Sequence, residues 1–129
     1  MPTLFTRIIT GELPCYCIAE DAHYFAFLDI NPLAKGHTLV VPKKEVDYIF
    51  DLDTETYTGL FTFGKRVAIA IGNAVPCLRV GLAVIGLEVP HAHIHLIPLQ
   101  SGTIDFSDPK LKLDKEELER IAVAIRNQL

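Results

Sequence analysis

The sequence predicts an α+β fold in which an antiparallel sheet of about five strands carries two main helices. Short segments rich in β-branched residues alternate with turn residues along the chain. Two longer segments instead place apolar residues at helical spacing. Together these patterns favour a sheet with helices on one side. A length of 129 residues predicts a single domain, residues 1–129, that can bury its own core.

The N-terminal third is expected to form a short helix and two strands. Gly11 ends the helix, and Pro14 with the segment 15–21 leads into the first strand. A turn over 31–36 joins the two strands, and Pro42 ends the second. The predicted elements of this third are a helix over 5–10, a strand over 23–30 and a strand over 37–42.

The rest of the chain is expected to form two helices and two further strands. The long helix runs from about Asp53 to Asn73, and the last helix starts at Asp114 with Glu117 as its capping-box partner. The apolar stripes are Leu60, Phe63, Val67 and Ile71 in the first and Leu118, Ile121, Ala122 and Ile125 in the second. Between the helices, the predicted strands cover 79–87 and 89–98, and 101–110 is a loop.

Composition and charge narrow the class of protein. Apolar residues make up 50% and charged residues 22%, which is typical of a globular domain. The net charge of −4 gives no attraction to nucleic acid, and no apolar run approaches the roughly 20 residues that span a bilayer. The N-terminus is a poor secretory signal because polar residues interrupt its apolar stretches. An odd count of three cysteines favours a reducing, cytoplasmic setting.

The segment HAHIHL places His91, His93 and His95 at every second position. In a strand these three side chains share one face, and the apolar residues between them face the core. One interpretation is a solvated polar face. A second is a metal site, with two histidine ligands and a third ligand from Glu88 or His37. A third is imidazole chemistry on phosphate, in which a histidine acts as nucleophile or proton carrier. The spacing of the histidines alone supports the metal site and the phosphate chemistry about equally.

Three ordered segments resemble the histidine triad (HIT) family. VPHAHIHLIP is similar to the family's His-x-His-x-His signature, FLDINPLAKGHTLVVPKK to a second block, and FTRIITGELPCYCIAED to the block that opens the domain. The resemblance covers about residues 3–98. It implies a HIT-like fold, a homodimer that shares a continuous sheet, and binding of a purine nucleotide or nucleotide conjugate. It also implies hydrolysis or transfer at the α-phosphate without a cofactor.

The resemblance also implies a role for each matching residue. His93 matches the nucleophile that forms a nucleotidyl-histidine intermediate, His95 the imidazole that contacts the phosphate, and His91 the one that supports the triad. Asp29 matches the carboxylate that binds the ribose hydroxyls, and His37 a histidine close to the site. The residues that match the apolar walls around the base are Phe5, Ile8, Phe27 and Ile30, for which plain core packing is the alternative.

The sequence departs from the family pattern in two places. Relatives with a zinc site carry two cysteines and a histidine where this chain has Thr3, Thr6 and Glu45, so no metal is expected. Before the triad, Leu87 stands where relatives carry glutamine, and Glu88 where some carry a small hydroxyl residue near the leaving group. Glu88 is therefore expected at the rim of the phosphate pocket, with a surface role as the alternative. The missing glutamine, together with the absence of an asparagine from the segment before the triad, also leaves open a nucleotide-binding regulatory protein with weak or no catalysis.

Overall fold

The computed structural model describes all 129 residues and contains one five-stranded sheet. The elements are α1 (Leu4–Ile9), β1 (Cys17–Glu20), β2 (Tyr24–Leu28), β3 (Thr38–Pro42), the 3-10 helix η1 (Ile49–Asp51), α2 (Thr54–Ala74), β4 (Arg79–Ala83), β5 (Ile94–Leu99) and α3 (Lys115–Arg126). The predicted α+β class, with an antiparallel sheet of five strands and two main helices, is confirmed. None of the helices is long and apolar enough to cross a membrane.

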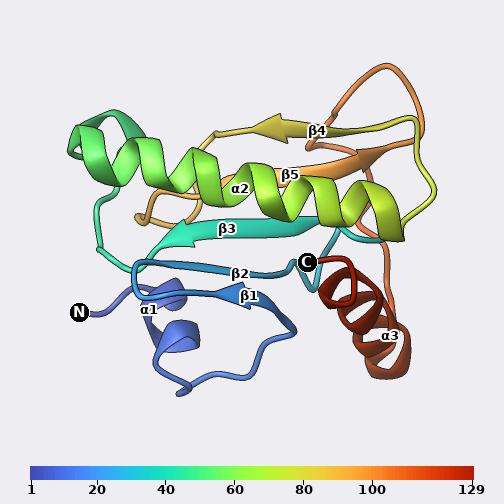
Figure 1. The fold of residues 1–129 in the computed structure, drawn as a ribbon, viewed down its shortest axis with the longest axis horizontal. Coiled ribbons are helices and arrows are strands. Elements are labelled where there is room, and N and C mark those ends of the chain that lie inside the picture. Colours follow the sequence, from blue (N-terminus) through green and yellow to red (C-terminus); the bar gives the residue numbers. More distant parts are fainter.

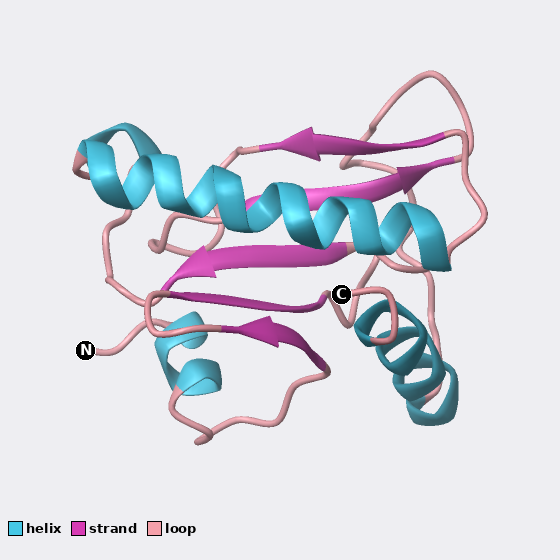
Figure 2. Ribbon diagram, viewed as in Figure 1, coloured by secondary structure: helices cyan, strands magenta, loops and turns pink.

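The sheet has the strand order β1-β2-β3-β5-β4, and every neighbouring pair is antiparallel. Figures 1 and 2 show α2 lying across one face of the sheet, with α3 near the edge strand β1. The short helix α1 contributes Phe5 to a separate apolar cluster, which includes Phe25, Phe27, Leu39 and Val41 from β2 and β3. The sheet therefore separates two apolar layers.

The larger core lies between the sheet and the helices α2 and α3. All four predicted stripe residues of α2 are buried in it, as are Leu118, Ala122 and Ile125 of α3, and Ile121 packs against it half-buried. Burying a side chain of this size contributes about 1.5–3 kcal/mol to stability. The apolar spacing thus determines which face of each helix meets the sheet.

Side-chain caps fix the start of both long helices. The Asp53 carboxylate accepts from the Thr56 backbone N–H at 3.2 Å, and the Asp114 carboxylate accepts from the Glu117 backbone N–H at 2.8 Å. The second half of the predicted capping box is replaced, because the Glu117 carboxylate forms an ion pair with Lys35. Glu117 therefore joins α3 to the turn between β2 and β3.

The strands differ in extent from the predictions. The segment 15–21 contains β1 itself, and the strands expected over 79–87 and 89–98 are shortened to β4 and β5. Residues 84–93 form a connecting loop in which Gly86 has a φ of +79°. Pro90 cannot donate a hydrogen bond to a neighbouring strand, so it also favours a loop here. This loop carries the first two histidines of HAHIHL, so its path decides much of the site's geometry.

Candidate active site

The three histidines of HAHIHL lie on either side of the start of β5. His91 and His93 are in the loop before the strand and His95 is within it, so the prediction of one continuous strand is wrong for the first two. The predicted alternation holds, since the residues between and after them that enter the larger core are Ala92, Ile94 and Leu96. A solvated polar face is contradicted, because His91 and His93 are only 0% and 5% exposed.

His91 is held through both ring nitrogens. Its Nε2 lies 2.7 Å from the carbonyl oxygen of Pro42, which can only accept, so Nε2 carries a hydrogen and donates it. Its Nδ1 lies 2.7 Å from Thr3 Oγ1 and accepts the hydroxyl hydrogen. Burial is the main cause that lowers the pKa of His91 below its usual 6.5, so the ring is neutral near pH 7. These contacts join the start of α1 to the end of β3 through the first triad histidine.

His93 has one ring nitrogen fixed and the other free. Its Nδ1 lies 2.8 Å from the carbonyl oxygen of His91 and must donate to it. In the neutral imidazole the other nitrogen, Nε2, is then unprotonated. Nε2 has no protein partner, yet no buried side-chain nitrogen or oxygen is unsatisfied, so Nε2 is open to the pocket that His93 lines. A free lone pair facing a pocket is what a histidine nucleophile requires.

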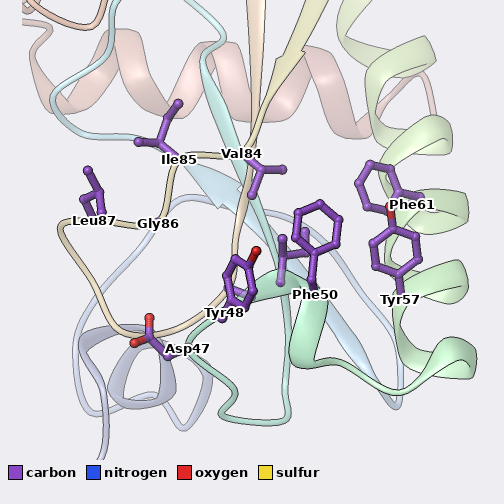
Figure 3. Close-up of a pocket in the computed structure, with 11 residues that line it drawn as sticks. Asp47, Tyr48, Phe50, Tyr57, Phe61, Val84, Ile85, Gly86 and Leu87 are labelled. Atoms are coloured by element: carbon purple, nitrogen blue, oxygen red, sulfur yellow. The ribbon is translucent and has the colours of Figure 1, made fainter.

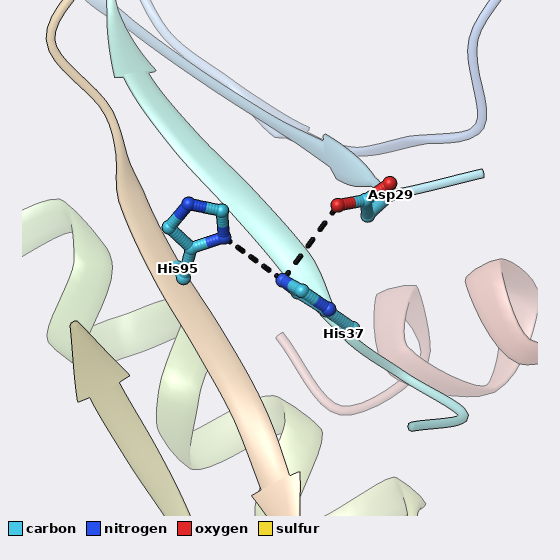
Figure 4. A group of neighbouring side chains, drawn as sticks. All are labelled: Asp29, His37 and His95. Carbon is cyan, nitrogen blue, oxygen red and sulfur yellow. Dashed lines mark hydrogen bonds and ion pairs between the residues drawn. The ribbon is translucent and has the colours of Figure 1, made fainter. Parts of the chain in front are cut away.

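His95 has the opposite arrangement because of His37. Nδ1 of His37 accepts from the Leu33 backbone N–H at 3.0 Å, so neutral His37 carries its hydrogen on Nε2. That Nε2 lies 3.0 Å from Nδ1 of His95 and donates to it, as Figure 4 shows. Neutral His95 therefore carries its hydrogen on Nε2, which has no protein partner. His95 can donate a hydrogen bond into the pocket where His93 can attack.

Gly36 allows His37 to reach this position. Its φ of +93° lies in the region that side chains other than glycine rarely adopt. A Cβ at this position would also lie 3.0 Å from Cγ2 of Val75 and 3.2 Å from Cγ of Pro98. The tight turn before β3 therefore requires glycine, and the turn places His37 beside His95.

Asp29 lies just beyond the end of β2 and opens onto the same pocket. Its carboxylate accepts from the Asn31 backbone N–H at 2.8 Å, and its Oδ2 lies 3.7 Å from Nε2 of His37, too far for a hydrogen bond (Figure 4). Burial is the main cause that raises the pKa of Asp29, and the negative charge of Glu88 adds to it. One carboxylate oxygen is therefore committed to the turn, and the other remains available to a ligand.

Asp29, His37 and His95 are also the residues that could hold a metal ion. Their ligand atoms lie within 4.8 Å of one another. The sequence offered His37 or Glu88 as the third ligand of a metal site. In the structure His37 belongs to this group and Glu88 does not. In the metal-free arrangement a hydrogen lies between the two imidazoles, so a metal ion would have to displace it.

The pocket has a volume of about 380 Å³. Its eleven lining residues are Asp29, Asn31, His37, Ile85, Gly86, Leu87, Glu88, His93, His95, Phe106 and Lys110. Glu88 is exposed and lines this pocket, and its role toward a phosphate stays a prediction. Sequence reasoning missed Phe106, whose ring centroid is 4.8 Å from that of His95, and also missed Lys110. Both belong to the loop after β5, and no residue spacing indicates that this loop returns to the triad.

Comparison with known proteins identifies the architecture. The HIT domain matches residues 10–102. The chain belongs to the histidine triad (HIT) family. The adenosine 5'-monophosphoramidase of Schizosaccharomyces pombe is 30% identical over 132 residues, which cover 100% of this chain and 99% of that protein.

Solved structures of other HIT proteins agree with this assignment. A HIT-like protein from Bartonella henselae is 32% identical, with a TM-score of 0.86 over 98% of this chain and 96% of that one. A zinc-bound histidine triad family protein from Mycobacterium smegmatis is 27% identical, with a TM-score of 0.79 over 97% of this chain and 91% of that one. The fold of this chain is therefore the HIT fold.

In this HIT protein, hydrogen-bonding residues occupy the positions that matched a zinc site in the sequence comparison. The Thr3 backbone N–H donates to Oε1 of Glu45 at 2.8 Å, and the Thr3 hydroxyl donates a hydrogen bond to Nδ1 of His91. A hydrogen bond from the Thr6 side chain is the main cause that lowers the pKa of Glu45. Threonine hydroxyls are not among the usual zinc ligands, so this cluster links α1 to the triad by hydrogen bonds.

Of the four residues matched to the base-binding walls, three belong to or pack against the smaller apolar cluster and one is exposed. Phe5 and Phe27 are buried in the smaller apolar cluster, and Ile8 packs against it. The Phe5 ring centroid lies 5.0 Å from that of His93, so this cluster packs directly against the His93 ring. Ile30 is 60% exposed beside Asp29. Their contact with a nucleotide base stays a prediction.

The buried neutral imidazoles predict a dependence of stability on pH. Burial is the main cause that lowers the pKa of His37 from 6.5 to about 3 and that of His95 to about 4. In the unfolded chain these two histidines therefore become protonated as the pH falls through about 6.5, whereas in the folded chain they stay neutral down to a much lower pH. The stabilisation is complete above about pH 6.5 and is lost as the pH falls toward the folded pKa values, at up to about 1.4 kcal/mol per pH unit for each histidine.

His37→Asn should therefore flatten the decline in the free energy of unfolding between about pH 7 and pH 5. Urea unfolding across this range measures the slope. His23→Asn, at an exposed histidine, is the control and should keep the wild-type slope. An unchanged slope in His37→Asn would show that His37 is not held neutral by the fold.

Proposed function

We propose that this HIT protein is a nucleotide hydrolase or nucleotidyl transferase that acts at the α-phosphate through a covalent nucleotidyl-histidine intermediate on His93. The observation that carries the proposal is the pair of complementary imidazoles at one pocket. His93 offers an unprotonated Nε2, and His95 offers an N–H donor. The S. pombe relative named adenosine 5'-monophosphoramidase supports a purine nucleotide conjugate as substrate. The proposed chemistry uses side chains alone and needs no cofactor.

In the proposed reaction, Nε2 of His93 bonds to the α-phosphorus while the bond from phosphorus to the leaving group breaks. The N–H of His95 donates to a phosphoryl oxygen and stabilises its charge. The leaving group takes up a proton from solvent as it departs. Water then attacks the phosphorus and gives up a proton to solvent, the bond to His93 breaks, and the nucleoside monophosphate is released. In a transferase another acceptor would take the place of water.

A panel of substrates tests the reaction class. Nucleoside phosphoramidates, dinucleoside polyphosphates and nucleotide sugars would be incubated with the protein, and release of the nucleoside monophosphate would be measured. Turnover of at least one class supports the proposal. Binding of nucleoside monophosphate without turnover of any class would favour the regulatory, nucleotide-binding alternative, for which the apolar Leu87 beside the triad is the structural argument.

Glu88 is proposed to act on the leaving-group side of the pocket. An ionised carboxylate there repels a phosphate, by roughly 1 kcal/mol at 4 Å in bulk water, whereas a protonated one can donate to the leaving group. Glu88→Gln should therefore change the pH dependence of turnover and, in the repulsive case, tighten binding of a nucleoside monophosphate. Glu116→Gln, at an exposed residue of α3, is the control. Matching pH profiles and affinities for wild type and Glu88→Gln would leave Glu88 as a surface residue.

We also propose that the protein is a homodimer. β4 forms one edge of the sheet, and its Leu82 is 48% exposed. Ile69, off the buried stripe of α2, is 56% exposed. Figure 3 shows a neighbouring cavity of about 350 Å³ between aromatic residues from the η1 region and α2 and the loop 84–87. An open edge strand beside exposed apolar side chains favours pairing with a second copy.

Sedimentation at micromolar concentration should give twice the monomer mass of 14.3 kDa. Leu82→Glu places a charge on the edge strand and should shift the protein toward monomer. Val123→Glu, at a 40% exposed position of α3, is the matched control and should stay dimeric. A wild-type protein that sediments only as a monomer would refute the dimer.

We further propose a cytoplasmic location, without nucleic acid or membrane as a partner. Cys15, Cys17 and Cys77 are free thiols, which suits a reducing compartment. The net charge of −4 opposes binding to nucleic acid.

A further inference from the structure

The pocket contains only one side chain with a permanent positive charge. Lys110 is the sole lysine or arginine among its lining residues, whereas Asp29 and Glu88 are carboxylates. His37 and His95 are neutral near pH 7 because burial, as the main cause, keeps the pKa of each at about 3 and about 4. A phosphate that enters the pocket therefore meets two carboxyl groups that can be negatively charged, those of Asp29 and Glu88, and one positively charged group, the ammonium of Lys110.

The Lys110 ammonium group is oriented by backbone oxygens. Nζ donates to the carbonyl oxygens of Phe106 and Asp108. No carboxylate lies within ion-pair distance of it, unlike Lys35, Lys43 and Lys44, which all have acidic partners. An ammonium group has three donors, so one remains for a ligand. The positive charge of Lys110 is held in place without being neutralised.

The loop that carries Lys110 is attached to the site at two points. The Leu111 backbone N–H donates to the Pro32 carbonyl oxygen at 2.8 Å, which joins the loop to the turn that follows Asp29. The Phe106 ring packs against the His95 ring. Figure 1 shows this loop leaving the end of β5 and returning past the sheet to α3. Lys110 therefore belongs to a segment that closes one side of the pocket.

The charge of Lys110 also acts on the residues of the site. After burial, which is the largest cause, it contributes to lowering the pKa of both His37 and His95. It also opposes the rise that burial causes in the pKa of Asp29. Lys110 thus acts electrostatically on the histidine pair and on the carboxylate that opens onto the pocket.

The loop on the other side of the pocket offers nothing to neutralise a phosphate. It contributes Ile85, Gly86, Leu87 and the acidic Glu88. We propose that Lys110 is a phosphate-binding residue of this site, whose ammonium group contacts a non-bridging oxygen of the nucleotide phosphate beside His95. This inference rests on the proposed nucleotide site, and it assigns to the loop after β5 the positive charge that the loop before β5 lacks.

Binding of AMP and of adenosine, measured by titration calorimetry on the full chain, tests this inference. Lys110→Met should weaken AMP binding about tenfold or more, the usual size of one lost charge-assisted hydrogen bond. It should leave adenosine binding within about twofold, because adenosine has no phosphate. Lys110→Arg should keep most of the AMP affinity. Lys112→Met, at an exposed lysine two residues away, is the control and should bind both ligands like wild type.

Equal AMP affinity in Lys110→Met and wild type would overturn the inference while leaving the proposed function intact. Equal losses for AMP and adenosine would also overturn it, because they would show that Lys110 only supports the loop. A wild-type protein that binds neither AMP nor adenosine would overturn the proposed function and this inference together.

Discussion

His93→Ala is expected to abolish turnover and to leave nucleotide binding largely intact. The substitution removes the only ring nitrogen that is both unprotonated and open to the pocket, so no bond to phosphorus can form. The rate should fall on the order of 10⁴-fold or more. AMP affinity should change little, because the proposed base and ribose contacts come from other residues. Initial rates and calorimetric titration of the same preparation measure both quantities.

The control for this variant is His23→Ala, at an exposed histidine between β1 and β2, which should keep wild-type activity. His91→Ala should lose less turnover than His93→Ala. In the wild type both ring nitrogens of His91 are hydrogen-bonded, to Thr3 and Pro42, so neither is free to react. Retention of more than about a tenth of the wild-type rate by His93→Ala would rule out the covalent mechanism, since loss of a nucleophile costs far more.

Asp29→Asn is expected to remove the preference for a nucleotide with ribose hydroxyls. Oδ1 of Asp29 already accepts from the Asn31 backbone N–H, so the ribose hydroxyls would donate to the two lone pairs of the charged Oδ2. In Asp29→Asn one of the two oxygen positions is an NH₂ group, which cannot accept, and the negative charge is lost. Hydrogen bonds to a charged group contribute about 1.5–3 kcal/mol, so AMP affinity should fall roughly 10- to 100-fold. Binding of 2′,3′-dideoxy-AMP should change much less. Titration of both ligands against wild type and variant measures the difference.

Asp21→Asn is a closely matched control. Asp21 also accepts from a backbone N–H two residues later, at 2.8 Å, but it lies in the exposed turn between β1 and β2. It should bind both ligands like wild type. If Asp29→Asn weakened AMP and dideoxy-AMP binding equally, the carboxylate would be supporting the turn at Asn31 and not binding the ribose.

The helices and the triad could be predicted because local patterns determine them. Neighbouring members of the α2 stripe lie three or four residues apart, and Asp114 caps the N–H three residues later, so both patterns relate residues about one helical turn apart. The alternation around His93 follows from the period of an extended chain, and it survives although β5 begins only at Ile94. Such features need no knowledge of distant parts of the chain.

The features that could not be predicted depend on contacts between distant segments. The bond between His37 and His95 joins residues 58 positions apart, and it decides which nitrogen of His95 carries the hydrogen. Lys110 reaches the pocket because the loop after β5 returns to Pro32 and to His95. β1 was missed because its four residues are too short for a periodic pattern. Composition and spacing contain no record of these contacts.

Covalent trapping tests the central claim of the proposed mechanism most directly. A substrate radiolabelled in the α-phosphate would be mixed with wild type, His93→Ala and His23→Ala, and each reaction would be stopped by denaturation under conditions that preserve phosphoramidate bonds. The proposed mechanism predicts label attached to denatured wild type and His23→Ala, located on His93, and none on His93→Ala. Release of product by wild type with no label on the protein at any time of quenching, or equal labelling of His93→Ala, would contradict a nucleotidyl-His93 intermediate.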